Sequence, residues 1–305
     1  MADIVPATRD SLVSENGSAS PYTPLPISNG MTSEVSLEGV SFSYPNGVKA
    51  LESVELTVPR AHTVSIVGPS GCGKSTLLAI VAGLTLPTSG TVTRCKVEPG
   101  RLPVTMVSQK ETLLPWLKVK DQVGLHFRLR RQHKTERVRA WVQDLLDLVG
   151  LGDFQDAYPY QLSGGMRRRV AFLTAVAPIP QVLLLDEPFS SVDEPTRLVI
   201  HQDVFDITRQ YEITTVLVTH DLAEAMSLSD EVIILSRGPG RVAAVHTMPF
   251  GPERDIVALR EQPEFLELYG KLWRELGLQL DNGGRKRQRS FRDSTSHRPD
   301  WMTEG

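Results

Sequence analysis

The sequence predicts an α/β protein with a parallel-sheet core, and three observations support this fold class. Residues 64–67 form a short apolar run that leads through a glycine-rich loop, residues 68–76, into a segment with an apolar helical face. Further along, several apolar runs lack polar alternation, which is typical of strands covered on both faces. A long stretch with helical periodicity separates the first two of these runs. The runs are residues 104–107, 182–185, 215–218 and 232–235.

The N-terminal part is predicted to be a disordered leader followed by a β-rich subdomain. Residues 1–34 are rich in Ser, Pro, Thr, Asn and Gly and show no apolar period, as disordered segments do. Apolar and polar residues alternate over residues 35–44 and again over 51–58, so each segment is expected to form a strand.

The middle and the end of the chain are predicted to be mainly helical. Thr135 is the expected N-cap of a helix whose apolar residues repeat on one face until Gly150. We therefore expect a helical subdomain inserted at about residues 110–165. Residues 246–280 are expected to form a C-terminal helical extension. Residues 281–305 are expected to be a basic disordered tail, for which contact with anionic lipid or RNA is the alternative.

Composition narrows the class of protein. The chain has 33 basic and 36 acidic side chains, and a net charge of −3 gives no general argument for nucleic-acid binding. Two cysteines, Cys72 and Cys95, are too few for a disulfide framework or a cysteine-based metal cluster and favour a reducing cytosol. No run approaches the roughly 18 apolar residues that a membrane span requires, so any membrane contact is expected to be peripheral.

The glycine-rich loop carries the clearest functional signal. It matches the pattern G-x-x-x-x-G-K-[ST] between a strand and a helix, the context in which this pattern cradles phosphates. Glycines let backbone N–H groups turn inward, Lys74 is expected to reach the β- and γ-phosphates, and Ser75 to ligate Mg²⁺. A chance match in a turn is the alternative, which the flanking strand and helix disfavour. The nucleoside triphosphate is expected to contact Gly68, Pro69, Ser70, Gly71, Cys72, Gly73, Lys74, Ser75 and Thr76.

Two further segments would complete a phosphate site. An apolar strand ends in Asp186, expected to reach the Mg²⁺ shell, and Glu187, expected to orient or deprotonate the attacking water. Ser163, Gly164 and Gly165 precede a helix and would form a second anion-binding concavity, a simple helix start being the alternative. Because one nucleotide has little use for two such loops, a site shared by two subunits is the economical explanation.

Three single residues complete the candidate site. Gln109 follows the apolar run at 104–107 and is expected to touch the metal or the water. His220 follows the run at 215–218, at the strand edge where α/β proteins bind ligands, although a lone histidine there is often structural. Tyr44 offers an aromatic face for stacking an adenine ring, with core packing as the alternative.

Taken in order, these residues resemble the nucleotide-binding subunit of an ATP-binding-cassette (ABC) transporter. The resemblance covers roughly residues 35–245, which we take as the ABC ATPase domain. Residues 68–76 resemble the Walker A loop, residues 183–187 the Walker B strand, and residues 162–166 the family signature.

The single residues fit the same family. Gln109 resembles the Q-loop glutamine, His220 the switch histidine, and Tyr44 the adenine-stacking aromatic residue. Residues 190–193 resemble the D-loop.

Other stretches narrow the resemblance or depart from it. Residues 113–117 and 235–242 look like the ATPase subunits of bacterial nitrate/sulfonate/taurine-type importers. Arg168 stands where the family usually has Gln, and Thr174 where it usually has Arg. Neither departure removes a catalytic group, but Arg168 could alter contacts across a dimer.

The resemblance implies the P-loop NTPase fold of an ABC cassette and an ATPase that uses ATP and Mg²⁺. Glu187, His220 and Gln109 would be catalytic, and Ser75, Gln109 and Asp186 would form the metal site. It also implies a homodimer that sandwiches ATP, a separate membrane permease and, indirectly, a solute-binding protein. The chain would lie peripherally on the cytoplasmic face of the inner membrane, with no nucleic-acid partner.

Several alternatives stay open at this point. A non-transport ABC ATPase acting on nucleic acid or ribosomes would be expected to carry long coiled coils or two cassettes, and this chain shows neither. A P-loop kinase would not explain residues 162–166, and a module without turnover would not need Glu187 and His220. Cys72 is a small spacer or a thiol whose modification blocks nucleotide binding. Nitrate, sulfonates, taurine and related small solutes are all candidate cargoes.

Overall fold

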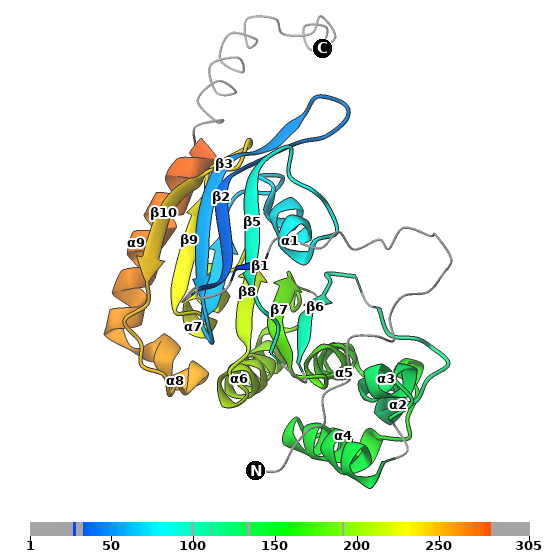
Figure 1. Cartoon of the computed structure of the whole chain (residues 1–305). Helices are drawn as coiled ribbons and strands as arrows, with labels where there is room; N and C mark the ends of the chain where they lie inside the picture. The colour runs from blue at the N-terminus through cyan, green and yellow to red at the C-terminus, as the bar shows by residue number, and fades with distance from the viewer. Residues whose placement is uncertain are drawn as a thin grey trace, which may run out of the picture.

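The computed structural model describes residues 27–28, 33–98, 101–110, 112–132, 135–190 and 192–281, which form two sheets and the helices around them (Figure 1). The strands are β1 (Ile27–Ser28), β2 (Ser33–Ser43), β3 (Lys49–Pro59), β4 (Thr63–Val67), β5 (Ser89–Cys95), β6 (Leu102–Val107), β7 (Pro180–Asp186), β8 (Thr214–Val218), β9 (Glu231–Leu235) and β10 (Val242–Thr247). The α-helices are α1 (Lys74–Ala82), α2 (Val119–Val123), α3 (Leu125–Leu129), α4 (Glu136–Leu148), α5 (Gly164–Val176), α6 (Glu194–Gln210), α7 (Leu222–Leu228), α8 (Ile256–Glu261) and α9 (Pro263–Asp281).

The smaller sheet has the strand order β1-β5-β2-β3, with β2 antiparallel to both β3 and β5. The predicted strands at 35–44 and 51–58 are thus confirmed, the first as β2 up to its end at Ser43 and the second as part of β3. The prediction of a disordered leader over residues 1–34 was wrong for its last part, because residues 27–28 form β1 and residues 33–34 begin β2. Ile27 of β1 pairs with Arg94 of β5. The rest of the leader, residues 1–26 and 29–32, lies outside the described residues.

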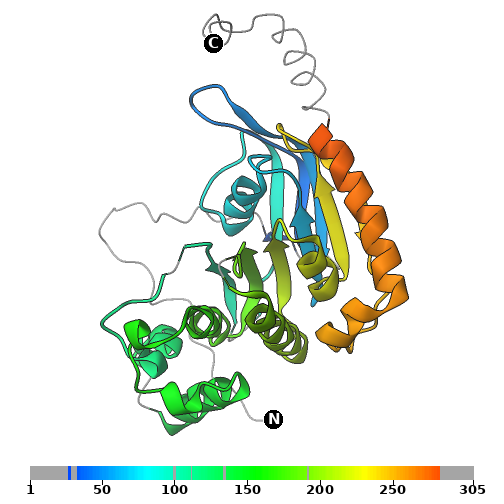
Figure 2. The same cartoon turned by 180° about the vertical axis from the view of Figure 1, so that it is seen from behind.

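The larger sheet has the order β10-β9-β4-β8-β7-β6, in which all strands except β10 run parallel. Every residue of β4 and β8 is buried, as the unbroken apolar runs predict. On one face, Ile66 packs in an apolar cluster with Leu78 of α1 and with residues of the smaller sheet. On the other face, Leu185 packs with Phe205 of α6. Figure 2 shows α6 and α7 on the side away from β2 and β3.

The predicted helical insert forms α2, α3 and α4, which lie at the end of the molecule opposite the loop between β2 and β3 (Figure 1). Thr135 is the N-cap of α4, as predicted, because its Oγ1 accepts a hydrogen bond from the Val138 N–H at 3.4 Å. The indole N–H of Trp141 donates to the Ala177 carbonyl at 2.8 Å, which ties α4 to the end of α5.

The C-terminal segment forms β10, α8 and α9, and α9 lies alongside β10 (Figures 1 and 2). Phe265 and Leu272 of α9 are buried in a cluster with Met226 of α7. The predicted basic tail begins at the last residue of α9, and residues 282–305 lie outside the described residues. Within the ranges described, no helix combines the length and the apolar character needed to cross a membrane.

Candidate nucleotide site

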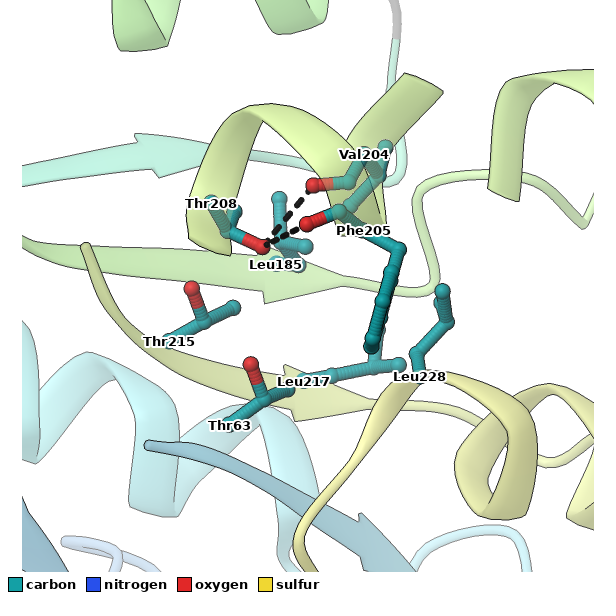
Figure 3. Close-up of a pocket in the computed structure, with 8 residues that line it drawn as sticks. All are labelled: Thr63, Leu185, Val204, Phe205, Thr208, Thr215, Leu217 and Leu228. Carbon is teal, nitrogen blue, oxygen red and sulfur yellow. Dashed lines mark hydrogen bonds between the residues drawn. The ribbon is translucent and has the colours of Figure 1, made fainter. Parts of the chain in front are cut away.

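A water-sized cavity of about 10 Å³ lies between α6 and the parallel sheet (Figure 3). Its walls include Phe205 and Leu217, and Thr208 turns its hydroxyl toward the carbonyl of Val204, to which it donates at 2.8 Å. None of the residues that line it is a predicted site residue. The candidate site must therefore be built at the carboxyl ends of the parallel strands instead.

The glycine-rich loop joins the end of β4 to the start of α1, as predicted. Gly71 and Gly73 have φ values of +76° and +99°, in the left-handed region that disfavours side chains. A Cβ atom on Gly73 would lie 2.7 Å from both the Ala50 carbonyl oxygen and a methyl carbon of Leu51. Close packing against β3 thus leaves room only for glycine at this position.

Lys74 and Cys72 are both held inside the loop. Lys74 is only 6% exposed, and its Nζ donates to the carbonyls of Gly68 at 2.8 Å and Pro69 at 3.1 Å. Cys72 is fully buried, and burial raises the pKa of its thiol. A buried, protonated thiol is a poor nucleophile, so the structure favours the spacer role over the modifiable thiol.

Ser75 and Asp186 meet where α1 and β7 approach each other. The Ser75 hydroxyl donates to Asp186 Oδ1 at 3.0 Å. Burial raises the pKa of Asp186, and the hydrogen bond from Ser75 opposes that rise. No group of three or more His, Cys, Asp or Glu side chains suited to a metal occurs among the described residues. A hydroxyl and one carboxylate fit Mg²⁺, which usually takes one or two carboxylates together with nucleotide phosphates and water.

Two of the residues predicted to be catalytic, Gln109 and His220, meet at one carboxylate oxygen of the third, Glu187. Glu187 follows β7 with φ at +44°, and its backbone N–H donates to the Val218 carbonyl at the end of β8. Its Oε2 accepts from Gln109 Nε2 at 3.1 Å and lies 3.3 Å from His220 Nδ1. Gln109 follows β6 and His220 follows β8, so neighbouring strands deliver all three side chains.

Tyr44 lies near the first turn of α1. Its hydroxyl is 2.8 Å from Thr76 Oγ1, and its ring meets Phe42 edge-on at 5.0 Å. With 44% of the residue exposed, Tyr44 is not part of the core, which disfavours the packing alternative.

None of the hydrogen bonds described for the signature residues, 162–166, runs to the phosphate loop. Ser163 is the N-cap of α5, and its Oγ accepts from the Met166 N–H at 3.2 Å. Ser163 and Gly164 are exposed, and nothing lies within 4 Å of a Cβ built on Gly164. Gly165 is different, because a Cβ there would lie 2.5 Å from the side chain of Thr196 in α6. At the start of α5, Gly165 therefore packs on α6, while Ser163 and Gly164 face outward.

Two contacts were missed in the sequence interpretation. Arg168 donates to the Gln109 carbonyl at 2.7 Å, so the residue that departs from the family pattern supports the Q-loop glutamine. Gly240 donates to the Ala50 carbonyl, and a Cβ on Gly240 would lie 2.1 Å from the Cys72 carbonyl oxygen. From the sequence alone, residues 235–242 indicate only a likeness to one importer subfamily. Their two closely spaced glycines were the available signal for backbone packing.

Comparison with known proteins places these motifs in a family. The sequence profile described as "ABC transporter" matches residues 51–190. The bicarbonate transport ATP-binding protein CmpD of Synechocystis sp. is 37% identical, over 81% of this chain and 90% of that protein. The taurine import ATP-binding protein TauB of Jannaschia sp. is 36% identical, over 76% and 90%. The nitrate import ATP-binding protein NrtD of Synechococcus elongatus is 38% identical, over 75% and 86%.

A solved structure supports the same conclusion. It is a dimeric ATP-binding cassette in a post-hydrolysis state bound to ADP and Pi, and it is 30% identical to this chain. The two superpose with a TM-score of 0.61, covering 71% of this chain and all of the other. The predicted α/β ABC-cassette fold is therefore confirmed. The chain belongs to the ATP-binding subunits of ABC transporters, a family of ATPases.

Proposed function

We propose that this chain hydrolyses ATP to energise an ABC importer of small solutes of the nitrate, sulfonate or taurine type. The convergence of Gln109 and His220 on Glu187, beside the Ser75–Asp186 pair, is the observation that carries this proposal. Three relatives whose names specify bicarbonate, taurine and nitrate transport or import support the solute class.

Nucleotide binding would rest on the phosphate loop. Loop N–H groups and Lys74 would hold the phosphates, and the exposed ring of Tyr44 would stack on adenine. Ser75 and Asp186, with Gln109 nearby, would hold Mg²⁺, which supplies charge neutralisation at the transferring phosphoryl group.

Hydrolysis would use Glu187 to orient the attacking water. The Gln109 amide donates to Glu187 Oε2, which leaves Oε1 to accept a hydrogen bond from the water. His220, whose ring is next to the same carboxylate, would contact the γ-phosphate. Water then attacks phosphorus, the bond to the ADP oxygen breaks, and the water proton passes to Glu187 or to the phosphate product.

The second half of each site would come from another copy of this chain. Ser163, Gly164 and Gly165 would bind the γ-phosphate held by the partner copy, since Ser163 and Gly164 are exposed at the start of α5. Dimeric forms of a related cassette support this arrangement. ATP would bind the closed dimer better than the open one, so binding closes the dimer and hydrolysis releases it.

A separate permease in the inner membrane would receive this motion through the helical insert, with the chain on the cytoplasmic face. A solute-binding protein would act indirectly by delivering solute to the permease. The names of the import proteins support a transport role, and none of the relatives reported above is named for nucleic-acid or ribosome work.

ATP hydrolysis by the purified chain, with Glu187→Gln beside it and protein concentration varied, tests the proposal. Turnover per subunit should rise with concentration and fall by about 100-fold or more in the variant. The variant should also form a dimer at saturating ATP, measurable by light scattering. Concentration-independent turnover, or a variant that stays monomeric with ATP bound, would contradict the shared site.

A further inference from the structure

A chain of polar contacts links helix α8 to segment 219–221 and to the start of α6, which flank the proposed hydrolytic centre. It begins at Arg260, whose guanidinium makes three contacts and whose side chain is only 14% exposed. Its Nε donates to Ser227 Oγ at 3.0 Å, one terminal nitrogen donates to Glu194 Oε1 at 2.9 Å, and the other lies 3.2 Å from His201 Nδ1.

One branch of these polar contacts runs through His201 and Glu224 to Thr219, the residue before His220. Arginine cannot accept a hydrogen bond, so His201 Nδ1 accepts and its Nε2 carries a proton. Nε2 therefore donates to Glu224 Oε1, at 3.1 Å, and Glu224 Oε2 accepts from the hydroxyl of Thr219. His201, Glu224 and Thr219 are all buried, so each contact satisfies a group that water does not reach.

A second branch runs to the residue after His220. Glu194, which Arg260 contacts, also pairs with Arg197 one turn further along α6. Arg197 in turn lies 3.7 Å from Asp221 Oδ2. Glu194 directly follows Asp193, the N-cap of α6, whose side chain accepts from the Thr196 N–H. The start of α6 and the segment 219–221 are thus tied to the same guanidinium.

We propose that Arg260 is a positioning residue for ATP hydrolysis. It fixes segment 219–221 and the start of α6 relative to each other, so that His220 faces Glu187. This inference rests on the proposed function. Arg260 would act only through this polar chain, because its hydrogen bonds run to Ser227, Glu194 and His201 and to none of residues 68–76. Nucleotide binding and hydrolysis should therefore respond differently to its removal.

The test compares Arg260→Ala with Gln202→Ala in the full chain. Gln202 neighbours His201 on α6 and also holds the C-terminal segment, because its Nε2 donates to the Arg254 carbonyl and its Oε1 accepts from the Ile256 N–H. The hydrogen bonds described for the Gln202 side chain run to Asp206, Arg254 and Ile256 rather than to Arg260, His201 or Glu194, so Gln202→Ala controls for loosened packing of α8. Arg260→Ala should lower kcat by about 5- to 10-fold with KM for ATP within about 2-fold, whereas Gln202→Ala should leave both within about 2-fold.

Hydrogen–deuterium exchange supplies a readout that does not depend on turnover. Amides of residues 217–221 and 193–197 should exchange faster in Arg260→Ala than in the wild-type chain, and Gln202→Ala should leave them unchanged. If Arg260→Ala does not fold, Glu194→Gln replaces it, since the Glu194 side chain is half exposed and the change breaks one branch only. That variant should lower kcat by about 2- to 3-fold.

Unchanged exchange at residues 217–221 in a folded variant would overturn the inference, as would equal losses of kcat in Arg260→Ala and Gln202→Ala. A wild-type chain that binds ATP but never hydrolyses it would overturn the proposed function instead. In that case faster exchange in Arg260→Ala would still establish the coupling between α8 and segment 219–221, while its role in hydrolysis would fall.

Discussion

Two helices in this chain begin with glycine-rich loops, and the two loops differ in how closely the rest of the chain packs against them. At the phosphate loop, Gly73 packs so closely on β3 that a Cβ atom would lie 2.7 Å from the Ala50 carbonyl oxygen, and Lys74 is 6% exposed. At the signature loop, Gly164 has open space around it and Ser163 is exposed. The first loop finds its structural partners within the chain. The second leaves Ser163 and Gly164 exposed at the helix start, which is the arrangement expected of a loop that acts on a neighbouring subunit.

The largest expected difference between the two loops is in how a substitution in each changes the affinity for ATP. Lys74→Ala removes a buried ammonium that would face the phosphates, so ATP affinity should fall by roughly two to three orders of magnitude. Ser163→Ala should leave affinity within about 2-fold at concentrations where the chain is monomeric, because its loop faces outward. Titration with a fluorescent ATP analogue measures both. Comparable losses in the two variants would show that a single chain uses both loops.

Stability should separate the loops next. Gly73→Ala places a side chain at φ +99° and against backbone, and should lower the free energy of unfolding by about 3 kcal/mol. Gly164→Ala meets nothing within 4 Å at a helix start, so the change should be within about 0.5 kcal/mol. Urea unfolding gives both values. If Gly164→Ala destabilises the chain as much as Gly73→Ala, the signature loop is packed in solution.

The pH dependence of stability tests how α5, which carries the signature loop, is held on α6. Asp203 of α6 lies 3.2 Å from Arg169 Nε of α5, and burial raises the pKa of Asp203 to about 6. Between pH 4 and pH 6 the native state therefore binds more protons than the unfolded state, and this group's stabilisation is lost as pH rises through that window. The loss should be about 2 kcal/mol between pH 4 and pH 6, and it should level off about one pH unit above the native pKa.

Asp203→Asn has no titrating group at position 203, so its unfolding free energy should lack the part that falls between pH 4 and pH 6. The comparison is the difference between the unfolding free energies of the two proteins, measured by urea at pH 4, 5, 6 and 7. Parallel profiles would show that the ion pair with Arg169 keeps the pKa of Asp203 near its ordinary value.

The phosphate loop could be predicted from the sequence because its signals are local. Glycine spacing, the strand before it and the helix after it occupy one short stretch, and Thr135 was found as an N-cap for the same reason. The strand β5 was missed, since its first three residues are exposed and only Val92 is buried, which leaves no alternation to detect. Sequence spacing also gave no sign that Arg260 reaches Glu194, because that contact depends on how α8 packs on α6.

The contact between Arg168 and the Gln109 carbonyl links α5, which carries the signature loop, to the proposed hydrolytic centre, and it offers the finest test. Arg168 lies in the first turn and a half of α5, and Gln109 donates to the Glu187 carboxylate, so a shift of α5 would reach Glu187 through one residue. Arg168→Gln restores the residue type usual in the family but shortens the side chain, so kcat should fall by about 3- to 5-fold with ATP affinity unchanged.

Arg167→Gln is the matched control for Arg168→Gln. Its guanidinium donates to the Leu162 carbonyl at 2.7 Å, inside the signature loop itself, whereas that of Arg168 donates to the Gln109 carbonyl. If the link through Gln109 carries information between the regions, a Gln109→Ala background should abolish the effect of Arg168→Gln on kcat and leave the effect of Arg167→Gln intact. Additive effects of Arg168→Gln and Gln109→Ala would mean that Arg168 acts on the signature loop alone, and that the two helix starts communicate only through the nucleotide they share.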